Sequence, residues 1–377
     1  LTPYQLNSTY TLPKLLWLHR HRPEVMARAR KILWPKDYLR FRLTGESCTD
    51  LTDAAGGALL DWETKTWAEA WPGLVGLDAN ALPAIQPATA SGGSIRPQVA
   101  GILGLNPDVQ VVVGMGDVAA LFGAAPPKAG RLTYSMGSSS QMATRLAADQ
   151  VAKDPLDRIY IYPFGPYPML GGVSSTTGSS LVWVCEKLGP GLDFEALVAQ
   201  ALEIEPGSDG LCFIPYLAGE RSPHWSDEIR AGFYGLQLAH DHPHLVRAVM
   251  EGVAYSLRHL LDVYEEMGVP VDEIAMAGGG TTARGWPQIM ADVCQRDVMI
   301  YAGQETVTRV LYALCQAHPG HQTFDEGLLH TFGKPDIIRS RHDLGPIYDG
   351  GYQRYRSFAR FAKEQADNSS NLFAEGL

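Results

Sequence analysis

The segment from Val109 to Asp117 reads Val109-Gln110-Val111-Val112-Val113-Gly114-Met115-Gly116-Asp117. Four valines in five positions predict a buried strand. The glycines that follow allow a tight turn and the close approach of a ligand. An aspartate at the end of such a turn can take the proton of a substrate hydroxyl. The competing interpretation is that Asp117 caps a helix over 118–123, and for an isolated turn we favour that interpretation.

Two further turns of small residues change this balance. The first is Tyr134-Ser135-Met136-Gly137-Ser138-Ser139-Ser140. The second is Ala277-Gly278-Gly279-Gly280-Thr281-Thr282. Each follows a β-rich run, and backbone N–H groups in turns of this kind bind phosphate. Three such turns in one chain predict a nucleotide site.

Composition limits the class of protein. The 377 residues suffice for two or three domains, and 45% hydrophobic with 19% charged residues is an ordinary globular mixture. The formal net charge of −10 disfavours nucleic acid or an anionic membrane surface as the main partner. No apolar run approaches the roughly 18 residues of a membrane span. We therefore expect a globular protein that acts on a small molecule.

Cysteine usage and the first residues bear on the compartment. The five cysteines are scattered and form no Cys-x-x-Cys pair, which favours a reducing compartment and disfavours structural zinc or disulfides. The first residues carry neither a basic nor an apolar signal region. We therefore expect a cytoplasmic protein. The chain begins with Leu1 rather than Met, so a fragment or a processed form stays open.

Strands alternate with helices along the chain, which predicts an α/β fold. The clearest helix covers 244–267, where apolar residues recur at helical spacing between Pro243 and Gly268. A change of pattern near 126–130 suggests a domain boundary, with a first domain at 1–128 and a second at 129–366. A last helix is predicted over 352–366, followed by a flexible tail at 367–377.

Several segments in the expected order resemble the FGGY carbohydrate kinases, most closely their xylulokinase-like branch. The segments that carry the resemblance are 11–21, 35–45, 49–56, 219–224, 230–236, the second-signature residues His244, Leu245, Ala248 and Glu251, and the glycine run 278–280 with Trp286, Ala291 and Asp292. Each motif is weak by itself, whereas six in the right order form a strong signal.

The resemblance implies an actin-like (ribonuclease H-like) two-domain α/β kinase fold, with ATP and sugar bound between the domains. It places Asp117 as the catalytic base, and Asp117 with Val118 on the sugar side. It assigns nucleotide contacts to Gly137, Ser138, Ser139, Gly178, Gly278, Gly279 and Gly280. Mg²⁺ is expected to bridge the phosphates, and no protein ligand is assigned to the metal.

The sequence also departs from the family pattern. The N-terminal Asp-x-Gly-Thr turn of the family has no counterpart here, so we expect a truncated first domain. Val118 stands where xylulokinases carry Asn, and Trp225 resembles gluconate-type members slightly more. The segment 308–312 is bulky where the family prefers small residues, which would crowd the nucleotide or reshape the packing.

Other candidate residues have simpler interpretations. The run 240–244 contains three histidines, but the adjoining helix start favours a solvated loop over a metal site. The pair Glu220 and Arg221 fits a structural ion pair or a cleft contact equally well. Ser138–Ser140 lacks the Gly-x-Ser-x-Gly elbow of a serine nucleophile. Trp17, Trp183 and Trp286 lie on apolar helix faces and are predicted in the core.

Two main hypotheses follow. The first is an ATP-dependent kinase of a small sugar or polyol, such as the ketopentose xylulose, with a homodimer left open. The second is a truncated, catalytically inactive relative that acts as a nucleotide- or protein-binding module. An upstream reading frame that encodes Asp-x-Gly-Thr would favour the first, and a start codon near Leu1 would favour the second. An actin-like assembly scaffold is a weaker third hypothesis.

Overall fold

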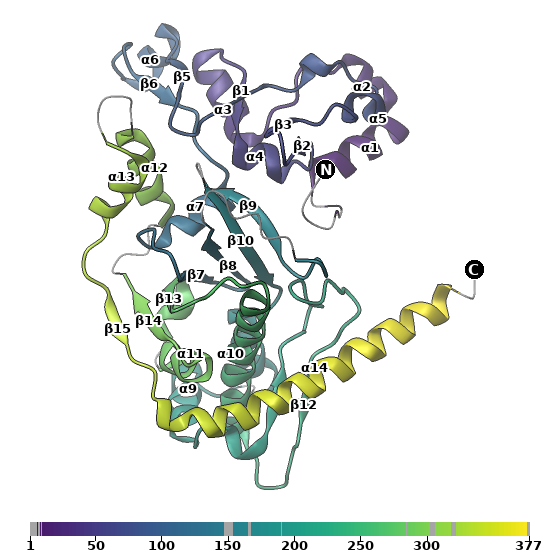
Figure 1. Ribbon diagram of the computed structural model, residues 1–377, viewed down its shortest axis with the longest axis vertical. Helices are drawn as coiled ribbons and strands as arrows, with labels where there is room; N and C mark the ends of the chain where they lie inside the picture. The colour runs from purple at the N-terminus through teal and green to yellow at the C-terminus, as the bar shows by residue number, and fades with distance from the viewer. Residues whose placement is uncertain are drawn as a thin grey trace.

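The computed structural model describes residues 6, 8, 10–146, 154–164, 167–189, 191–283, 285–301, 306–317 and 322–374. Figure 1 shows two parts: the N-terminal elements, drawn in purple and blue, lie above a larger part built on a sheet. Helix α7 lies between them. Among the described helices, none is both long and apolar enough to cross a membrane.

The N-terminal part consists of short elements. In chain order they are α1 (Thr11–His21), α2 (Pro23–Arg28), α3 (Pro35–Thr44), β1 (Cys48–Asp50), α4 (Leu51–Gly56), β2 (Leu60–Asp61), β3 (Thr66–Trp67), α5 (Trp71–Val75), β4 (Ala84–Gln86), β5 (Ser91–Ser94), α6 (Pro97–Leu103), β6 (Gln110–Val112) and α7 (Asp117–Leu121). The described strands pair as β1 with β4, β2 with β3 and β5 with β6. The core of this part is correspondingly divided into small clusters.

The strand expected at 109–113 is present but is not fully buried. It forms β6, where Gln110 is exposed while Val111 and Val112 are half-buried. The prediction of a buried strand is therefore wrong in part. The reason is that β6 pairs only with β5 within the described residues, so that one edge and much of its faces lack a neighbour.

The larger part is organised around one sheet. Its described strands run in the order β15-β14-β13-β7-β8-β10-β9. Their bounds are β7 (Arg131–Met136), β8 (Ser140–Arg145), β9 (Tyr160–Phe164), β10 (Tyr167–Ser174), β13 (Glu273–Ala277), β14 (Asp297–Ile300) and β15 (Asp336–Ile338). Strand β13 is parallel to β7 and β14, and the other described pairs in this sheet are antiparallel. A separate ribbon joins β11 (Cys212–Ile214) to β12 (Gly232–Tyr234).

The larger part also contains helices. They are α8 (Gly178–Trp183), α9 (Phe194–Glu203), α10 (His242–Glu266), α11 (Trp286–Cys294), α12 (Thr306–Gln316), α13 (Phe324–Thr331) and α14 (Gly345–Ala374). Helix α10 confirms the strongest periodic prediction of the sequence, and nearly all its residues from Val246 to Tyr264 are buried. Trp286 is in the core as predicted, and Trp183 packs against the core. Trp17 is 56% exposed, because α1 buries only Leu15, so its core prediction is wrong.

The last helix is longer than predicted. Helix α14 begins at Gly345 and extends to Ala374, whereas a flexible tail was expected from 367. Three tyrosines in its first half, Tyr348, Tyr352 and Tyr355, are buried and fix this half on the core. Once a helix is nucleated, each added residue gains a hydrogen bond, so the polar sequence after 366 continues it. Residues 375–377 lie outside the described part.

The two parts meet where α7 packs on α12. A buried cluster joins Met115, Ala119 and Phe122 to Val310 and Leu314. The bulky segment 308–312 therefore contributes Val310 to packing between the parts, while Leu311 and Tyr312 are 44% and 56% exposed. This packing places the start of α7, and with it Asp117, beside the sheet of the larger part.

Candidate active site

Asp117 is the first residue of α7, and Gly116 occupies the capping position. The Asp117 carboxylate accepts a hydrogen bond from the N–H of Val118 at 2.7 Å. Asp117 is otherwise exposed, and Val118 beside it is half-buried. The side chain thus lies at the helix start without serving as its N-cap, and its carboxylate remains accessible to a substrate.

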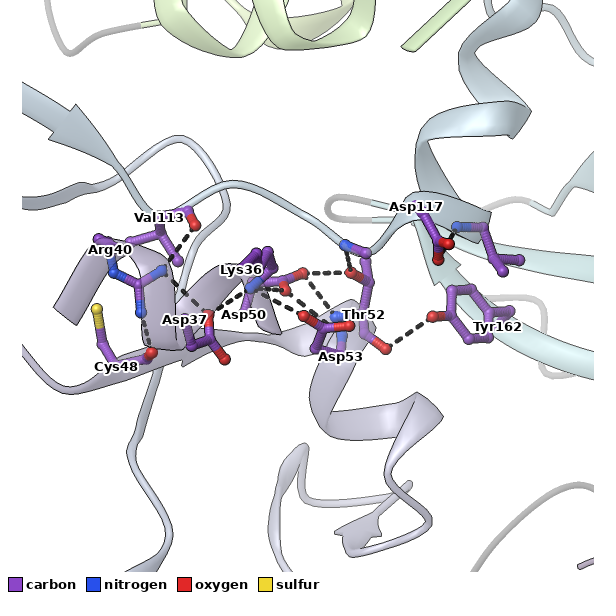
Figure 2. Close-up of polar contacts among 12 residues, drawn as sticks. Lys36, Asp37, Arg40, Cys48, Asp50, Thr52, Asp53, Val113, Asp117 and Tyr162 are labelled. Carbon is purple, nitrogen blue, oxygen red and sulfur yellow. Dashed lines mark hydrogen bonds and ion pairs between the residues drawn. The ribbon is translucent and has the colours of Figure 1, made fainter. Parts of the chain in front are cut away.

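A network of buried charges lies under this turn (Figure 2). The Lys36 ammonium is 2.6 Å from Asp37, 3.0 Å from Asp50 and 3.1 Å from Asp53. The guanidinium of Arg40 pairs with Asp37 at 3.0 Å and donates to the carbonyl oxygen of Val113 at 2.8 Å. The strand end that leads into the Asp117 turn is therefore attached directly to this network.

The local sequence explains how the network forms. Asp50 caps α4, since its carboxylate accepts from the N–H of Thr52 at 2.7 Å. Lys36 and Arg40 are four residues apart on α3, so they lie on one face of that helix. Asp50 and Asp37 are buried with 1% and 0% exposure, which requires such partners.

Burial also shifts the pKa values of these groups. Burial raises the pKa of Asp53 to about 6, against the opposing effect of Lys36. Burial by itself would lower the pKa of Lys36, but Asp50, Asp53 and Asp37 outweigh it and raise that pKa. Lys36 therefore stays charged, and the Asp53 carboxyl changes its protonation near pH 6.

Several glycines predicted to bind nucleotide come together around residues 136–138, at the end of β7. The N–H of Gly178 donates to the carbonyl oxygen of Gly137 at 2.9 Å. A Cβ atom on Gly178 would lie 2.6 Å from that oxygen, and one on Gly278 would lie 2.6 Å from the carbonyl oxygen of Met136. Gly280 packs against the Met136 side chain. These contacts define a glycine cradle around 136–138, made by Gly137, Gly178, Gly278 and Gly280.

The cradle suits a phosphate-bearing ligand. Gly137 and Ser138 are exposed, and Ser139 is half-buried. Two of the three turns that the sequence singled out thus meet here, and Gly178 joins them. Gly279 has open space around it, so it is the least constrained member of the predicted set.

Asp117 does not lie in this cradle. Among the residues that the structure describes, no hydrogen bond joins it to the glycine turns. The preceding residue, Gly116, lies against Tyr162 of β9. Tyr162 pairs with Met169, which pairs with Arg145, whereas Ser140 at the cradle lies five residues along β8. At strand rise this is roughly 17 Å.

Glu220 makes structural hydrogen bonds at the end of β10. Its buried carboxylate accepts hydrogen bonds from Ser174 Oγ at 2.9 Å and from the N–H groups of Ser175 and Arg221 at 2.7 and 2.8 Å. Burial raises the pKa of Glu220 to about 7. The Arg221 guanidinium instead donates to the carbonyl oxygen of Ser174 at 3.1 Å. The pair therefore fixes the end of β10.

A cavity of about 570 Å³ opens beside Met115, two residues before Asp117. Its lining comprises Asp50, Leu51, Thr52, Lys65, Ile85, Gln86, Pro87, Ala88, Thr89, Met115, Leu314, Ala317, Thr323 and Phe324. Most of the surface is apolar, and Asp117 is not part of it.

Comparison with known proteins agrees with these features. The N-terminal domain model of the FGGY family of carbohydrate kinases matches residues 1–123, and the C-terminal domain model matches 132–309. The chain belongs to this family. It is 35% identical over 298 residues to the xylulose kinase of Lactococcus lactis, covering 77% of this chain and 58% of that protein. It is 30% identical over 308 residues to the gluconokinase of Bacillus licheniformis, covering 78% and 60%. The chain thus spans less than two thirds of the length of these relatives.

Solved structures confirm the fold of this FGGY-family chain. The gluconate kinase of Lactobacillus acidophilus matches with a TM-score of 0.88 at 25% identity, over 95% of this chain and 73% of that one. A ligand-bound xylulose kinase from the same organism matches with a TM-score of 0.87 at 25% identity, over 93% and 72%. The predicted actin-like two-domain α/β fold is therefore confirmed.

The charged network is the part of the site that sequence reasoning missed. Lys36, Asp50 and Asp53 lie in segments that carry the family resemblance, yet no role was predicted for them. A usable signal was present, since charged residues inside otherwise packed short elements must find partners. What could not be foreseen is how the network is joined to the Asp117 turn, because Thr52 and Gly116, which connect the two, are 64 residues apart.

Proposed function

We propose that this chain acts as an ATP-dependent carbohydrate kinase that transfers the γ-phosphoryl group of ATP to a hydroxyl of a small sugar or polyol. The observation that carries the proposal is the exposed carboxylate of Asp117 at the start of α7, on a turn held by buried charges. The glycine cradle provides the second element, a site for phosphate groups. Family membership and the xylulose kinase and gluconokinase relatives support the same class of reaction.

In this proposal Asp117 accepts the proton of the substrate hydroxyl as its oxygen attacks the γ-phosphorus. The bond from that phosphorus to the β,γ-bridging oxygen breaks, and ADP leaves. In this proposal the phosphates lie against the cradle, in which the N–H groups of Gly137 and Gly178 already donate to the carbonyl oxygens of Ser139 and Gly137. Phosphoryl transfer leaves little covalent chemistry to the protein, so positioning and charge stabilisation are its main contribution. A bound Mg²⁺ would supply neutralisation of phosphate charge.

The separation between Asp117 and the cradle has a consequence for the mechanism. The Asp117 turn and the cradle lie beside opposite ends of β8, a stretch of strand roughly 17 Å long, whereas a catalytic base acts only within hydrogen-bond reach of the reacting hydroxyl. We therefore expect the two parts to approach each other when both ligands bind. Such closure would also exclude water and prevent hydrolysis of ATP.

The identity of the sugar substrate is a second part of the proposal. Xylulose kinases and gluconokinases both occur among the relatives. We propose a ketopentose such as xylulose, because several of the most similar relatives are xylulose kinases. Val118, half-buried beside Asp117, replaces an Asn expected from the xylulokinase resemblance, and it would remove one hydrogen bond to the sugar. Gluconate is therefore the competing substrate.

Replacing the base tests the proposal. Asp117→Asn should lower sugar phosphorylation by at least about 100-fold while ATP binding is retained, because only proton transfer is lost. The measurement is the rate of ADP formation, followed by a coupled enzyme assay with pentuloses, polyols and gluconate as acceptors. Nucleotide binding is measured separately by calorimetry. The matched control is Asp108→Asn, an exposed aspartate on the loop before β6, which should behave as wild type.

Two outcomes would contradict the proposal. Residual turnover of Asp117→Asn within about tenfold of wild type would exclude this residue as the base. A wild-type chain that binds ATP but phosphorylates no member of the panel would favour the nucleotide-binding module instead. The comparisons themselves do not support that module.

A further inference from the structure

One hydroxyl group connects the Asp117 turn to the rest of the N-terminal part. The Oγ1 atom of Thr52 accepts a hydrogen bond from the N–H of Gly116 at 2.7 Å. The same hydroxyl donates to the Oδ2 atom of Asp50 at 2.6 Å. It thus uses its donor and one acceptor site at once, and Thr52 is 1% exposed. Gly116 is the residue immediately before Asp117.

The acceptor of this hydroxyl is itself fixed. Asp50 is 1% exposed, caps α4 through the N–H of Thr52, and is paired with the Lys36 ammonium at 3.0 Å. A carboxylate bound in this way has little freedom to rotate. The Thr52 hydroxyl donates to this fixed carboxylate, so its oxygen is left to accept from the N–H of Gly116. Dashed lines in Figure 2 mark these hydrogen bonds of Thr52.

A second bond reaches Thr52 from the larger part. The hydroxyl of Tyr162, on β9, donates to the carbonyl oxygen of Thr52 at 2.8 Å. The Tyr162 ring also contacts Phe122, just after α7, edge-on at 6.4 Å between centroids. A chain of contacts therefore runs from the sheet through Tyr162 and Thr52 to the turn before Asp117.

The turn needs such an anchor. Gly114 adopts φ +79°, and glycines leave the backbone free to take other conformations. The N–H of Gly116 is buried with its residue, so losing its acceptor would leave an unsatisfied donor. A general base must stay within hydrogen-bond reach of the hydroxyl, and small displacements cost rate.

We propose that Thr52 is a positioning residue that fixes the Asp117 carboxylate for proton transfer, and that Tyr162 links this position to the sheet of the larger part. The inference rests on the proposed function, in which Asp117 is the base. It assigns to Thr52 an effect on turnover that exceeds its effect on substrate binding.

Three variants separate positioning from simple packing. Thr52→Val keeps the shape and removes the hydroxyl, Thr52→Ser keeps the hydroxyl, and Tyr162→Phe removes only the donor to the Thr52 carbonyl. The control is Thr64→Val. The Thr64 hydroxyl lies on the exposed turn between β2 and β3 and is hydrogen-bonded to the hydroxyl of Thr66. Each variant is compared with wild type by thermal unfolding, so that loss of fold is recognised.

Kinetics give the first readout. Thr52→Val should lower kcat by about 10- to 100-fold with the KM for sugar changed less than about threefold. Thr52→Ser should restore kcat to within about threefold, and Tyr162→Phe should fall between them. Equal losses in Thr52→Val and Thr52→Ser would overturn the proposal, because the hydroxyl would then be irrelevant. So would a change confined to KM.

Amide hydrogen exchange gives a readout that does not depend on activity. Exchange at 114–118 should become faster in Thr52→Val than in wild type, with exchange in β13 unchanged in the same protein. Unchanged exchange at 114–118 would overturn the positioning role. A wild-type chain that phosphorylates no sugar, combined with faster exchange in Thr52→Val, would instead reject the proposed function and keep the structural link.

Discussion

The Asp117 turn and the glycine cradle are held by opposite means. The turn rests on side chains: Lys36 and Arg40 among buried carboxylates, with the hydroxyl of Thr52 as the last link. The cradle rests on bare backbone, where Gly178 and Gly278 approach main-chain oxygens more closely than a side chain allows. The first region should therefore respond to changes of charge and pH. The second should respond to the addition of a single methyl group.

The largest expected effect comes from removing the cation of the turn. Lys36→Met leaves Asp50 and Asp53 without their ammonium partner, while Asp37 keeps Arg40. We expect the free energy of unfolding to fall by about 3–5 kcal/mol, as for a buried ion pair that loses one member. Urea unfolding at pH 7 measures this loss.

An exposed ion pair provides the control for Lys36→Met. Arg22 pairs with Glu24 at 2.7 Å, and both side chains are more than half exposed. Arg22→Met should cost at most about 1 kcal/mol. If Lys36→Met proves as mild as Arg22→Met, the charges under the turn are not what holds it, and the contrast between the two regions is lost.

These two regions also differ in how far the sequence could predict them. The turns at Gly137 and Gly278 carry a local signal, small residues after strands, and the structure brings them together, whereas Gly178 is expected only from the family resemblance. The bonds that tie this network to the Asp117 turn and to the sheet are not predicted, because they join positions 64 and 110 residues apart with no common period. Local patterns find turns and helices such as α10, whereas tertiary partners decide which buried charges are satisfied.

The wrong predictions have the same origin. The valines of β6 predict burial, but burial depends on neighbouring strands, and β5 is the one described neighbour. The polar residues after 366 predict disorder, but the tyrosines of α14 fix the helix on which they continue. In each case the local sequence was interpreted correctly and the surroundings decided otherwise.

The second-largest expected effect is a dependence of stability on pH at the Asp117 turn, which the glycine cradle should not share. Burial raises the pKa of Asp53 from 3.8 to about 6, so the folded state binds this proton more tightly than the unfolded chain. The stability that the folded state gains by binding this proton is fully present below about pH 4. It is lost as the pH rises through about 6, and the loss in the free energy of unfolding is up to about 3 kcal/mol for a pKa shift of this size. Wild type should therefore lose stability relative to Asp53→Asn between pH 4 and pH 6.

The readout is the difference in unfolding free energy between wild type and Asp53→Asn, measured by urea unfolding at several pH values. Taking the difference cancels the titration of all other groups that the substitution leaves unchanged. A difference that stays flat from pH 4 to pH 7 would show that Asp53 titrates normally. The turn would then be no more sensitive to pH than the cradle.

The smallest expected change in stability belongs to the cradle, where one added methyl group should still weaken nucleotide binding. Gly278 adopts φ +89°, and an added Cβ would lie 2.6 Å from the Met136 carbonyl oxygen. Gly278→Ala should cost about 1–3 kcal/mol and weaken ATP binding by at least about tenfold, because the turn must move away from its phosphate-binding geometry.

Gly279→Ala meets open space and should change ATP affinity by less than about threefold. Calorimetric titration of both proteins with ATP compares adjacent glycines that differ in backbone φ and in room for a methyl group. Equal affinities in the two variants would mean that the cradle yields without penalty, and that rigid backbone is not the means by which this chain holds a nucleotide.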